Sequence, residues 1–307
     1  MNRKTFLRNA TLAGANLLTS NKLAARPTPY TPTKLAISHA DRPNICKTCG
    51  TRYAKHQHRA DECAVCLDDR QYLKASGQEW VSFTQLAIGH SIKVKAHSEH
   101  LHELSITPRF AIGQRAFFIQ TPAGNVLWDC LPLLTEPVVD FIRQRGGLQA
   151  IAISHPHYYS LMQEWSKAFQ CPIYIHAADR QWVMDKSENI VFWNEKRLPL
   201  QEDIELIHTG GHFPGSAILR ASLPSLAATI FVGDTLYLSL DKRHLSAMNS
   251  YPNFIPLRTT ETLRVLSEIN TLDFEALFGA FAHQNIYHNA KNILEDSLAK
   301  YQQTITR

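Results

Sequence analysis

Two histidines one residue apart are the residues of this sequence best suited to chemistry. His155 and His157 lie in the segment 154–160, directly after the apolar run 149–153. Side chains at positions i and i+2 of an extended segment point to the same side, so both imidazoles can face one point. The end of a buried strand is also where α/β sheets place their sites. The pair therefore predicts a metal site, although an isolated HxH pair is more often a pair of ordinary loop histidines.

Two later loops offer further metal ligands. His212 follows two glycines after the apolar run 203–208, and Asp234 lies at the end of the next long apolar run. The glycines permit a tight loop that brings the backbone at His212 close to a site. Three imidazoles can hold one tetrahedral metal ion together with a water molecule, and the carboxylate can add a ligand or hold that water. His283 is either one more ligand or a solvated histidine at a loop tip.

Four cysteines form a second candidate metal site. Cys46 and Cys49 make one CxxC pair, and Cys63 and Cys66 make another. Two such knuckles can present four thiolates tetrahedrally, as in a zinc ribbon, or around a single iron, as in rubredoxins. A segment this short rarely folds on an apolar core alone, so a bound ion is its natural stabiliser. We expect zinc here, with iron, or four free or disulfide-bonded cysteines, as the alternatives.

The composition is that of a soluble globular protein. The 307 residues are 44% hydrophobic and 19% charged, and the 15 histidines favour metal chemistry. The formal net charge of +5 comes without a block of Lys and Arg, so nucleic-acid binding is not indicated. No apolar run approaches the ~20 residues that a membrane helix needs. We expect a small-molecule substrate, and the sequence does not indicate an oligomeric state.

The chain divides into three predicted parts. Residues 1–43 are a proline-containing extension or signal-like segment, residues 44–75 a zinc-ribbon-like four-cysteine element, and residues 76–307 the α/β domain. The double CxxC favours metal over disulfides, and with it a reducing, cytoplasmic compartment. Residues 1–25 also resemble a twin-arginine export signal, which makes the periplasm the alternative.

Apolar runs alternate with helical patterns in the α/β domain. Strands are predicted at 116–121, 126–130, 149–153, 172–176, 203–208, 217–221, 229–235 and 276–283, and helices at 136–147, 161–169, 259–269 and 290–304. Strand ends that carry histidine and aspartate, alternating with helices, predict an α/β sandwich with its site along one edge. The four histidines within residues 86–108 fit no metal motif, and we expect them at the surface.

The order of these motifs resembles the metallo-β-lactamase-fold hydrolases. His155 and His157 match the first two histidines of the family motif HxHxDH, His212 matches its distant third histidine, and Asp234 matches its bridging aspartate. The resemblance covers about residues 105–290. It implies an αββα sandwich with the metal site at the edge of the sheets.

Two positions depart from the family pattern. Tyr159 stands where the family has aspartate, and Ser160 where it has its fourth histidine, while His283 is only a loose match to its last histidine. A phenol and an alcohol are poor metal ligands at neutral pH, so we predict one metal ion instead of two. Tyr159 then either takes part in catalysis, by binding substrate or donating a proton, or fills the space of the second ion. With its cysteine element, the chain looks like an uncharacterised subgroup of the family.

Three functions fit these residues. The first is a mononuclear metal-dependent hydrolase, in which metal-bound hydroxide attacks an ester, thioester, lactone or amide while Asp234 orients the water or takes its proton. Zinc is the expected ion at this site as well. The second is a mononuclear iron oxidoreductase on the same fold, because histidine and carboxylate ligands around open positions suit ferrous iron. The third is a non-catalytic binding module.

Overall fold

The computed structural model describes residues 34–54 and 62–305, which belong to one compact unit, Thr33–Arg307. The signal-like segment predicted at residues 1–25 lies outside the described residues. None of the described helices is long and apolar enough to cross a membrane.

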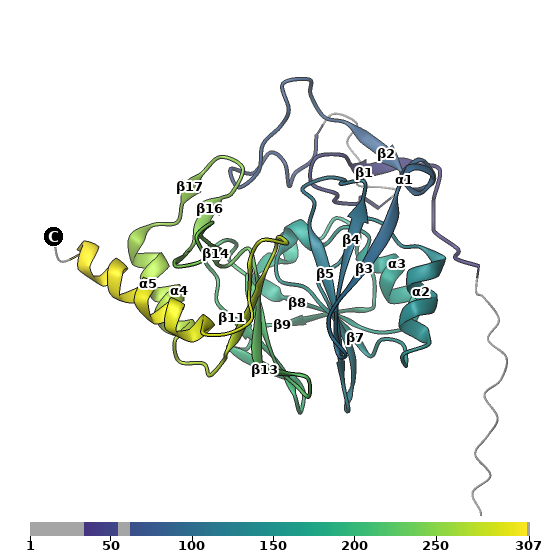
Figure 1. Ribbon diagram of the computed structural model, residues 1–307. Coiled ribbons are helices and arrows are strands. Elements are labelled where there is room, and N and C mark those ends of the chain that lie inside the picture. The colour runs from purple at the N-terminus through teal and green to yellow at the C-terminus, as the bar shows by residue number, and fades with distance from the viewer. Residues whose placement is uncertain (1–33, 55–61, 306–307) are drawn as a thin grey trace, which may run out of the picture. The chain divides into compact units, whose positions relative to one another are not determined.

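Two β-sheets form the middle of this unit (Figure 1). In the described residues, the first sheet has the strand order β3-β4-β5-β6-β7-β8-β9 and the second has the order β10-β11-β12-β13-β18-β19. The first sheet is antiparallel from β3 to β6 and parallel from β6 to β9, and β13 and β18 pair in parallel in the second. The strands of the first sheet are β3 (Ser91–Ser98), β4 (Leu101–Thr107), β5 (Arg115–Thr121), β6 (Gly124–Trp128), β7 (Ala150–Ala152), β8 (Ile173–His176) and β9 (Ile190–Trp193). Those of the second are β10 (Arg197–Gln201), β11 (Ile204–His208), β12 (Ala217–Leu223), β13 (Leu226–Gly233), β18 (Ala276–Gly279) and β19 (Asn285–Ile286).

Helices cover the outer face of each sheet. They are α2 (Glu136–Arg143) and α3 (Met162–Phe169) on the first sheet, and α4 (Thr259–Ile269) and α5 (Ala290–Ile305) on the second. A further helix, α1 (Phe83–Gly89), packs its Leu86 against Ile45 and Leu133 instead, and short 3₁₀ turns lie at η1 (Pro156–Tyr158) and η2 (Ala177–Trp182). Val139 of α2 and Trp165 of α3 pack with Ile151 on the first sheet. Leu266 of α4 packs with Ile230 on the second sheet, where α5 completes the layer. Each helix thus buries one apolar face against a strand surface.

Alternating side chains along the strands fill the space between the two sheets. In β6, Val126 and Trp128 face the second sheet, and Leu127 faces the helix layer. Phe231 and Phe278 of the second sheet pack against this inner face, as the period of two along a strand requires. The layers are therefore helix, sheet, sheet, helix, and the predicted αββα sandwich is confirmed.

Most of the predicted elements are present with small shifts. The helix α4 has the predicted bounds, whereas α2 ends at Arg143 because Gly146 and Gly147 take positive φ angles after it. The strands β3 and β4 were not predicted. The prediction that the histidines of this region lie at the surface is wrong for two of them. The side chain of His97 is 1% exposed, and His102 as a whole residue is 8% exposed. His97 is held inside by a 2.8 Å contact between its Nε2 and Glu103.

The four-cysteine element is built on a small strand pair and tight turns. β1 (Pro43–Cys46) pairs antiparallel with β2 (Trp80–Ser82), so this pairing spans the predicted boundary between residues 75 and 76. The Gly50 amide donates to the Cys46 carbonyl over 2.9 Å, and the Leu67 amide donates to the Cys63 carbonyl over 3.0 Å. Each CxxC pair thus lies on its own turn. The three-part division of the chain stays a prediction.

The remaining short strands lie beside the second sheet. They are β14 (Tyr237–Leu238), β15 (Leu245–Ser246), β16 (Met248–Ser250) and β17 (Ile255–Pro256), which form two antiparallel pairs in the segment between β13 and α4. Figure 1 shows β16 and β17 in light green above α4, at the left of the view.

Candidate metal centres

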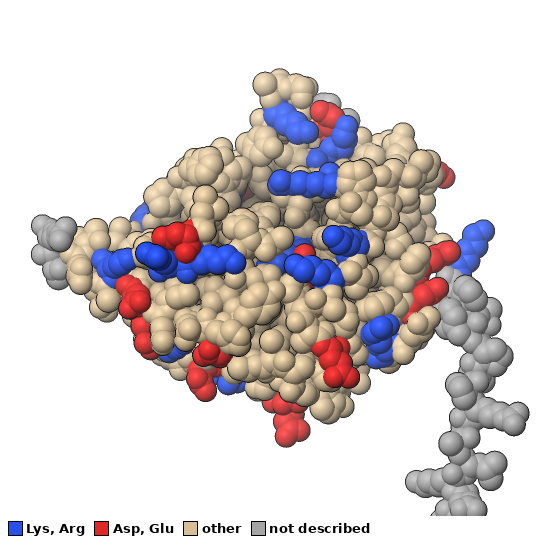
Figure 2. Space-filling view, in the orientation of Figure 1, with Lys and Arg blue, Asp and Glu red and all other residues tan. Residues whose placement is uncertain are grey.

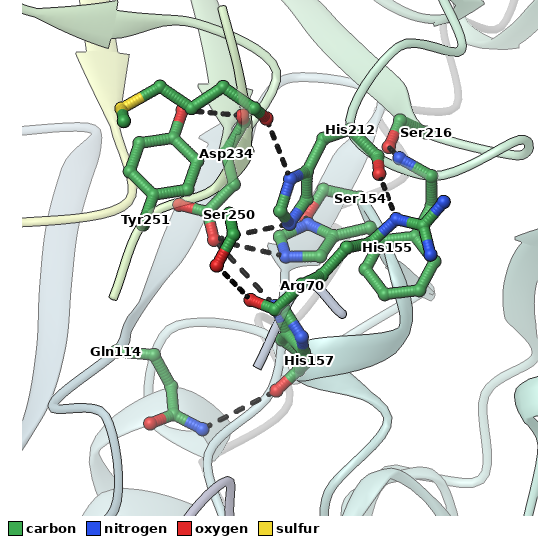
Figure 3. Close-up of polar contacts among 12 residues, drawn as sticks. Arg70, Gln114, Ser154, His155, His157, His212, Ser216, Asp234, Ser250 and Tyr251 are labelled. Atoms are coloured by element: carbon green, nitrogen blue, oxygen red, sulfur yellow. Dashed lines mark hydrogen bonds and ion pairs between the residues drawn. The ribbon is translucent and has the colours of Figure 1, made fainter. Parts of the chain in front are cut away.

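Three imidazoles converge on one carboxylate oxygen in the first candidate site (Figure 3). From the Asp234 Oδ2 atom, the distance is 3.3 Å to His155 Nε2, 3.8 Å to His157 Nδ1 and 3.8 Å to His212 Nε2. All four side chains are buried. Their potential ligand atoms lie within 4.8 Å of one another. The structure therefore brings together the four residues that the sequence predicted as a metal site, which we call the His/Asp site.

Strand ends position these four side chains at one edge of the sandwich. His155 and His157 follow β7, His212 follows β11, and Asp234 follows β13 directly. Gly233 lets the end of β13 approach the loop after β7 closely. A Cβ atom at this position would lie 2.7 Å from the Ser154 hydroxyl, and the φ angle of +51° favours glycine. The two sheets thus meet at Gly233 and Ser154, and their strand ends deliver the ligands from both sides.

Hydrogen bonds to the far sides of two imidazoles decide which nitrogens are free. The Ser154 hydroxyl donates to Asp129 Oδ1 over 2.8 Å, so its oxygen accepts from His155 Nδ1, 2.9 Å away. His212 Nδ1 donates to the Met248 carbonyl over 3.1 Å. In both rings the Nε2 lone pair is then left pointing at Asp234. Asp129 and Ser154 were not predicted as residues of the site. An aspartate directly after β6, the strand next to β7, could have indicated such a role.

The charges of the His/Asp site suit a divalent cation. Burial lowers the pKa of His155 and brings that of His212 well below its usual value, so both rings are neutral at neutral pH. Burial opposes ionisation of Asp234, and positive charge on the facing His155 and His157 rings, or a cation bound between them, holds the pKa of this carboxyl below its usual range. The set therefore offers neutral nitrogen donors and one negative charge in a buried place.

Unpaired buried atoms show whether the His/Asp site fits a metal ion. His155 Nε2, both ring nitrogens of His157, His212 Nε2 and Asp234 Oδ1 are buried without a hydrogen-bond partner among the described residues. Buried polar atoms in native proteins are nearly always paired, and each such orphan calls for an unseen partner. One metal ion at the convergence point would pair with several of them at once. The residues present thus fit a metal ion.

The structure places the remaining predicted residues elsewhere. Tyr159 is 3% exposed and packs in the core between the first sheet and its helices, outside the cavity described below. The Ser160 hydroxyl donates to the backbone carbonyl of Tyr158. His283 lies against Tyr237, with ring centroids 6.0 Å apart, and is not part of the His/Asp site. A catalytic role for Tyr159 stays a prediction, and its burial in the core does not favour it.

The second candidate centre holds all four predicted cysteines. Their sulfur atoms are buried and lie within 4.8 Å of one another, with 3.5 Å between those of Cys46 and Cys66 and 3.7 Å between those of Cys49 and Cys63. A tetrahedral zinc with bonds of about 2.3 Å requires edges of about 3.8 Å between its sulfurs. The Gln78 amide and the Tyr53 hydroxyl also point hydrogens at this sulfur cluster. The four side chains therefore fit one ion held by four thiolates, and we call this group the tetracysteine site.

The element around the tetracysteine site contacts the His/Asp site directly. Arg70 Nε donates to the His212 carbonyl over 2.5 Å, and its guanidinium lies 4.6 Å from the centre of the Phe213 ring (Figure 3). Gln114 Nε2 lies 3.4 Å from the Cys49 carbonyl and 3.5 Å from the His157 carbonyl. These contacts could not be predicted, because Arg70 and His212 are 142 residues apart in the sequence.

A cavity of about 260 Å³ opens onto the His/Asp site. His157 and Asp234 form part of its wall, together with Arg70, Gln71 and Tyr72 from the cysteine element. A space of this kind admits a small molecule to the ligands of the site. The Tyr251 hydroxyl, which donates to the Asp234 carbonyl over 2.6 Å, closes another side of the cavity.

A curated protein of Bacillus subtilis (strain 168) is 38% identical to this chain over 260 residues, which are 84% of this chain and 94% of that protein. It is described as the uncharacterized protein YmaE. The chain belongs to the YmaE family. No family model matches the sequence. The comparison defines the family by sequence and leaves its activity to be inferred from the site.

Solved structures share the fold of this chain at low sequence identity. The DIM-1 metallo-β-lactamase has a TM-score of 0.51 with 13% identity, over 70% of this chain and 98% of that chain. A metallo-β-lactamase from Erythrobacter litoralis has a TM-score of 0.51 with 12% identity, over 69% and 96%. One from Pontibacter korlensis has a TM-score of 0.50 with 11% identity, over 69% and 99%. The fold of this chain is therefore the metallo-β-lactamase fold.

Proposed function

We propose that this protein is a hydrolase that uses a single metal ion, zinc as the first choice, in the His/Asp site. The observation that carries the proposal is the convergence of three partnerless imidazole nitrogens on Asp234 at the wall of a cavity. A cation held there supplies Lewis acidity and lowers the pKa of a coordinated water toward neutrality. The substrate is a small molecule with an ester, thioester, lactone or amide bond.

The protein's own residues prepare this site before any substrate enters. Ser154 and the Met248 carbonyl hold the rings of His155 and His212 with one nitrogen turned inward. Asp234 stays ionised, so it can accept a hydrogen bond from a water molecule and orient it toward the cavity. Such preorganisation spares the reaction the cost of turning these groups.

A single metal ion, instead of two, follows from the positions that depart from the family pattern. Tyr159 lies in the core, and the Ser160 hydroxyl is engaged by a backbone carbonyl. Among the described residues, the only groups of potential metal ligands are the His/Asp site and the tetracysteine site. We therefore propose zinc at each of these two sites, with a catalytic role for the first and a structural role for the second.

A hydrolysis assay on zinc-loaded protein tests the proposal. The panel contains an aryl ester, a thioester, a lactone and an anilide, and the variants are His155→Ala and the matched control His100→Ala, which changes a histidine outside the site. We expect hydrolysis of at least one substrate class by the wild type and by His100→Ala, and its loss in His155→Ala. Stoichiometric zinc without hydrolysis of any of the four would contradict the proposal. Bound iron with oxygen consumption would favour the oxidoreductase instead.

A further inference from the structure

An arginine without an acidic partner lies in the wall of the cavity beside the His/Asp site. Arg109 lines the cavity, and the only hydrogen bond or ion pair that its guanidinium makes with the described residues is a 2.6 Å hydrogen bond to the Ile112 carbonyl. The other cavity arginine, Arg70, is held by Asp68 at 2.7 Å. Asp234 is the one carboxylate in the described wall of the cavity, and it belongs to the metal site. Arg109 therefore has donors left for a ligand.

The local backbone holds Arg109 in this place. Gly113 has a φ angle of +73°, and a Cβ atom there would lie 2.4 Å from Arg109 Nε, so the side chain folds directly over this glycine. The hydrogen bond to Ile112 fixes one end of the guanidinium. A side chain positioned in this way loses less entropy on binding an anion than a free arginine does.

A second observation points to a ligand in the same cavity. Gln71 lines the cavity and is 4% exposed, and its Oε1 atom is buried without a hydrogen-bond partner among the described residues. A buried carboxamide that lacks a partner is costly unless a ligand or water completes it. Arg109 thus offers a cation to an anionic group, and Gln71 offers an acceptor to an N–H or O–H group, within the cavity that His157 and Asp234 also line.

An aromatic cavity adjoins this polar one. It has a volume of about 490 Å³, and Tyr251 and Phe281 line both spaces. Tyr237 and Phe254 add two more rings to its wall, and Phe254 is 82% exposed although it is a large apolar residue. Exposed apolar side chains that line a hollow next to a reactive site are typical of ligand-binding surfaces. This space suits an aryl or other apolar group.

The surface charge agrees with an anionic ligand. In Figure 2, Lys and Arg side chains lie across the middle of the face, whereas many Asp and Glu side chains lie toward its lower edge. A band of basic side chains of this kind attracts anions to the face that carries it.

We infer that the substrate is an acyl ester or amide with a carboxylate on one side of the scissile bond and an apolar group on the other. Arg109 binds the carboxylate side, and the aromatic cavity takes the apolar side. This inference rests on the proposed hydrolase function. In the reaction, the oxygen of water bonds to the acyl carbon, the bond from that carbon to the leaving atom breaks, and a hydrogen of the water passes to the leaving atom.

Matched pairs of esters test the inference. The first pair is 4-carboxyphenyl benzoate and its neutral 4-carbamoylphenyl analogue, and the second is phenyl 4-carboxybenzoate and its 4-carbamoyl analogue, so that the carboxylate is offered on either side. We expect kcat/KM to be about 10- to 100-fold higher for the carboxylate in at least one pair, which is the range of a charge-assisted hydrogen bond. Arg109→Gln should remove this preference, Arg109→Lys should keep part of it, and the exposed control Arg197→Gln should keep all of it.

A binding measurement separates Arg109 from the metal, which can itself attract a carboxylate. In His155→Ala protein, calorimetric titration with 4-hydroxybenzoate should show binding that 4-hydroxybenzamide lacks and that the added change Arg109→Gln abolishes. Equal kcat/KM for carboxylate and carboxamide in both pairs, or a preference that survives Arg109→Gln, would overturn the inference and leave the hydrolase intact. Absence of hydrolysis for every ester, with the calorimetric difference present, would instead count against the proposed function alone.

The aromatic cavity has its own control. Replacing the uncharged aryl group of the preferred ester by a methyl group, which turns benzoyl into acetyl in the first pair and phenyl into methyl in the second, should raise KM in the wild type. This difference should shrink in Phe254→Ala. An unchanged ratio between the aryl and methyl esters in Phe254→Ala would show that the apolar group binds elsewhere and would overturn this half of the inference.

Discussion

Arg70 Nε donates a hydrogen bond of 2.5 Å to the carbonyl oxygen of His212, and this contact joins the four-cysteine element to a ligand of the His/Asp site. Asp68 holds the other end of the guanidinium, with 2.7 Å between Arg70 Nη1 and Asp68 Oδ1. The Ser250 hydroxyl donates to the Arg70 carbonyl. The cysteine element is thus part of the wall that positions His212, and its integrity should matter to the other centre.

Replacing Arg70 should therefore weaken the His/Asp site without touching a ligand. We expect Arg70→Ala to lower metal affinity there by roughly 10-fold, since groups behind metal ligands contribute about 10- to 100-fold. Equilibrium dialysis against a chelator, with metal counted in each fraction, measures this. The control is Arg197→Ala, an exposed arginine paired with Glu205. If Arg70→Ala holds its metal as tightly as Arg197→Ala, the contact with His212 has no positioning role.

Ser154 should act on the same site through His155. Its hydroxyl connects Asp129 to His155 Nδ1, so Ser154→Ala frees the ring to rotate and to change tautomer. We expect about a 10-fold loss of metal affinity, and the backbone amide of residue 154 would still donate to Asp129 over 2.8 Å. Ser160→Ala is the matched control, because that hydroxyl only contacts a backbone carbonyl. Equal affinities for the two variants would show that the hydrogen bond does not orient the ring.

Tyr159→Phe distinguishes a core residue from a catalytic one. Because Tyr159 packs in the core and does not line the cavity, loss of its hydroxyl should leave kcat and KM within about twofold of the wild type. Steady-state rates on the best substrate of the panel measure this. If the turnover rate instead falls by about 100-fold or more, with the melting temperature unchanged, Tyr159 is restored as a proton donor or substrate ligand.

Asp179 should make stability depend on pH. Its carboxyl accepts from the Gly215 amide over 2.7 Å, its Oδ2 has no partner among the described residues, and burial raises its pKa to about 7 against the pull of Gly215 and Arg70. The unfolded carboxyl has a pKa of about 3.9, so between these values the folded state holds the proton and the unfolded state has lost it. Stability from this group is complete below pH ~4 and is lost as the pH rises to about 7.

The matched variant for this effect is Asp179→Asn, which keeps an acceptor for Gly215 and cannot ionise. We expect the unfolding free energy of the wild type minus that of the variant to be larger at pH 5 than at pH 8. The change should be about 1.4 kcal/mol for each pH unit of this range that lies between the unfolded and the folded pKa of Asp179. Urea unfolding at several pH values gives the two curves. Parallel curves would show that Asp179 ionises alike in the folded and unfolded states.

Local sequence patterns predicted much of the fold and the residues that gather at the two candidate centres. The residues of the His/Asp site could be found because His155 and Asp234 follow apolar strands, and strand ends gather at one edge of such a sandwich. The edge strand β3 was missed, with Lys93 and Lys95 on its exposed side. The burial of His97 depends on contacts such as that with Tyr287, 190 residues away, which no local pattern contains.

What the sequence could not supply is the connection between the two centres. Arg70 and Gln114 are ordinary polar residues in the sequence, and their roles arise only when the cysteine element packs on the loops of the sandwich. The same holds for Arg109, whose lack of an acidic partner is a property of the folded cavity. Tertiary packing decides such contacts, so they require coordinates.

Elemental analysis of purified protein tests the central claim most directly. The wild type should contain two metal ions per chain, His155→Ala should lose the ion of the His/Asp site, and Cys46→Ser should lose the ion of the tetracysteine site. We therefore predict two zinc ions per chain in the wild type and one ion per chain in each variant. A third ion in the wild type, or a His155→Ala protein with the full metal content, would contradict a mononuclear site built on His155, His157, His212 and Asp234.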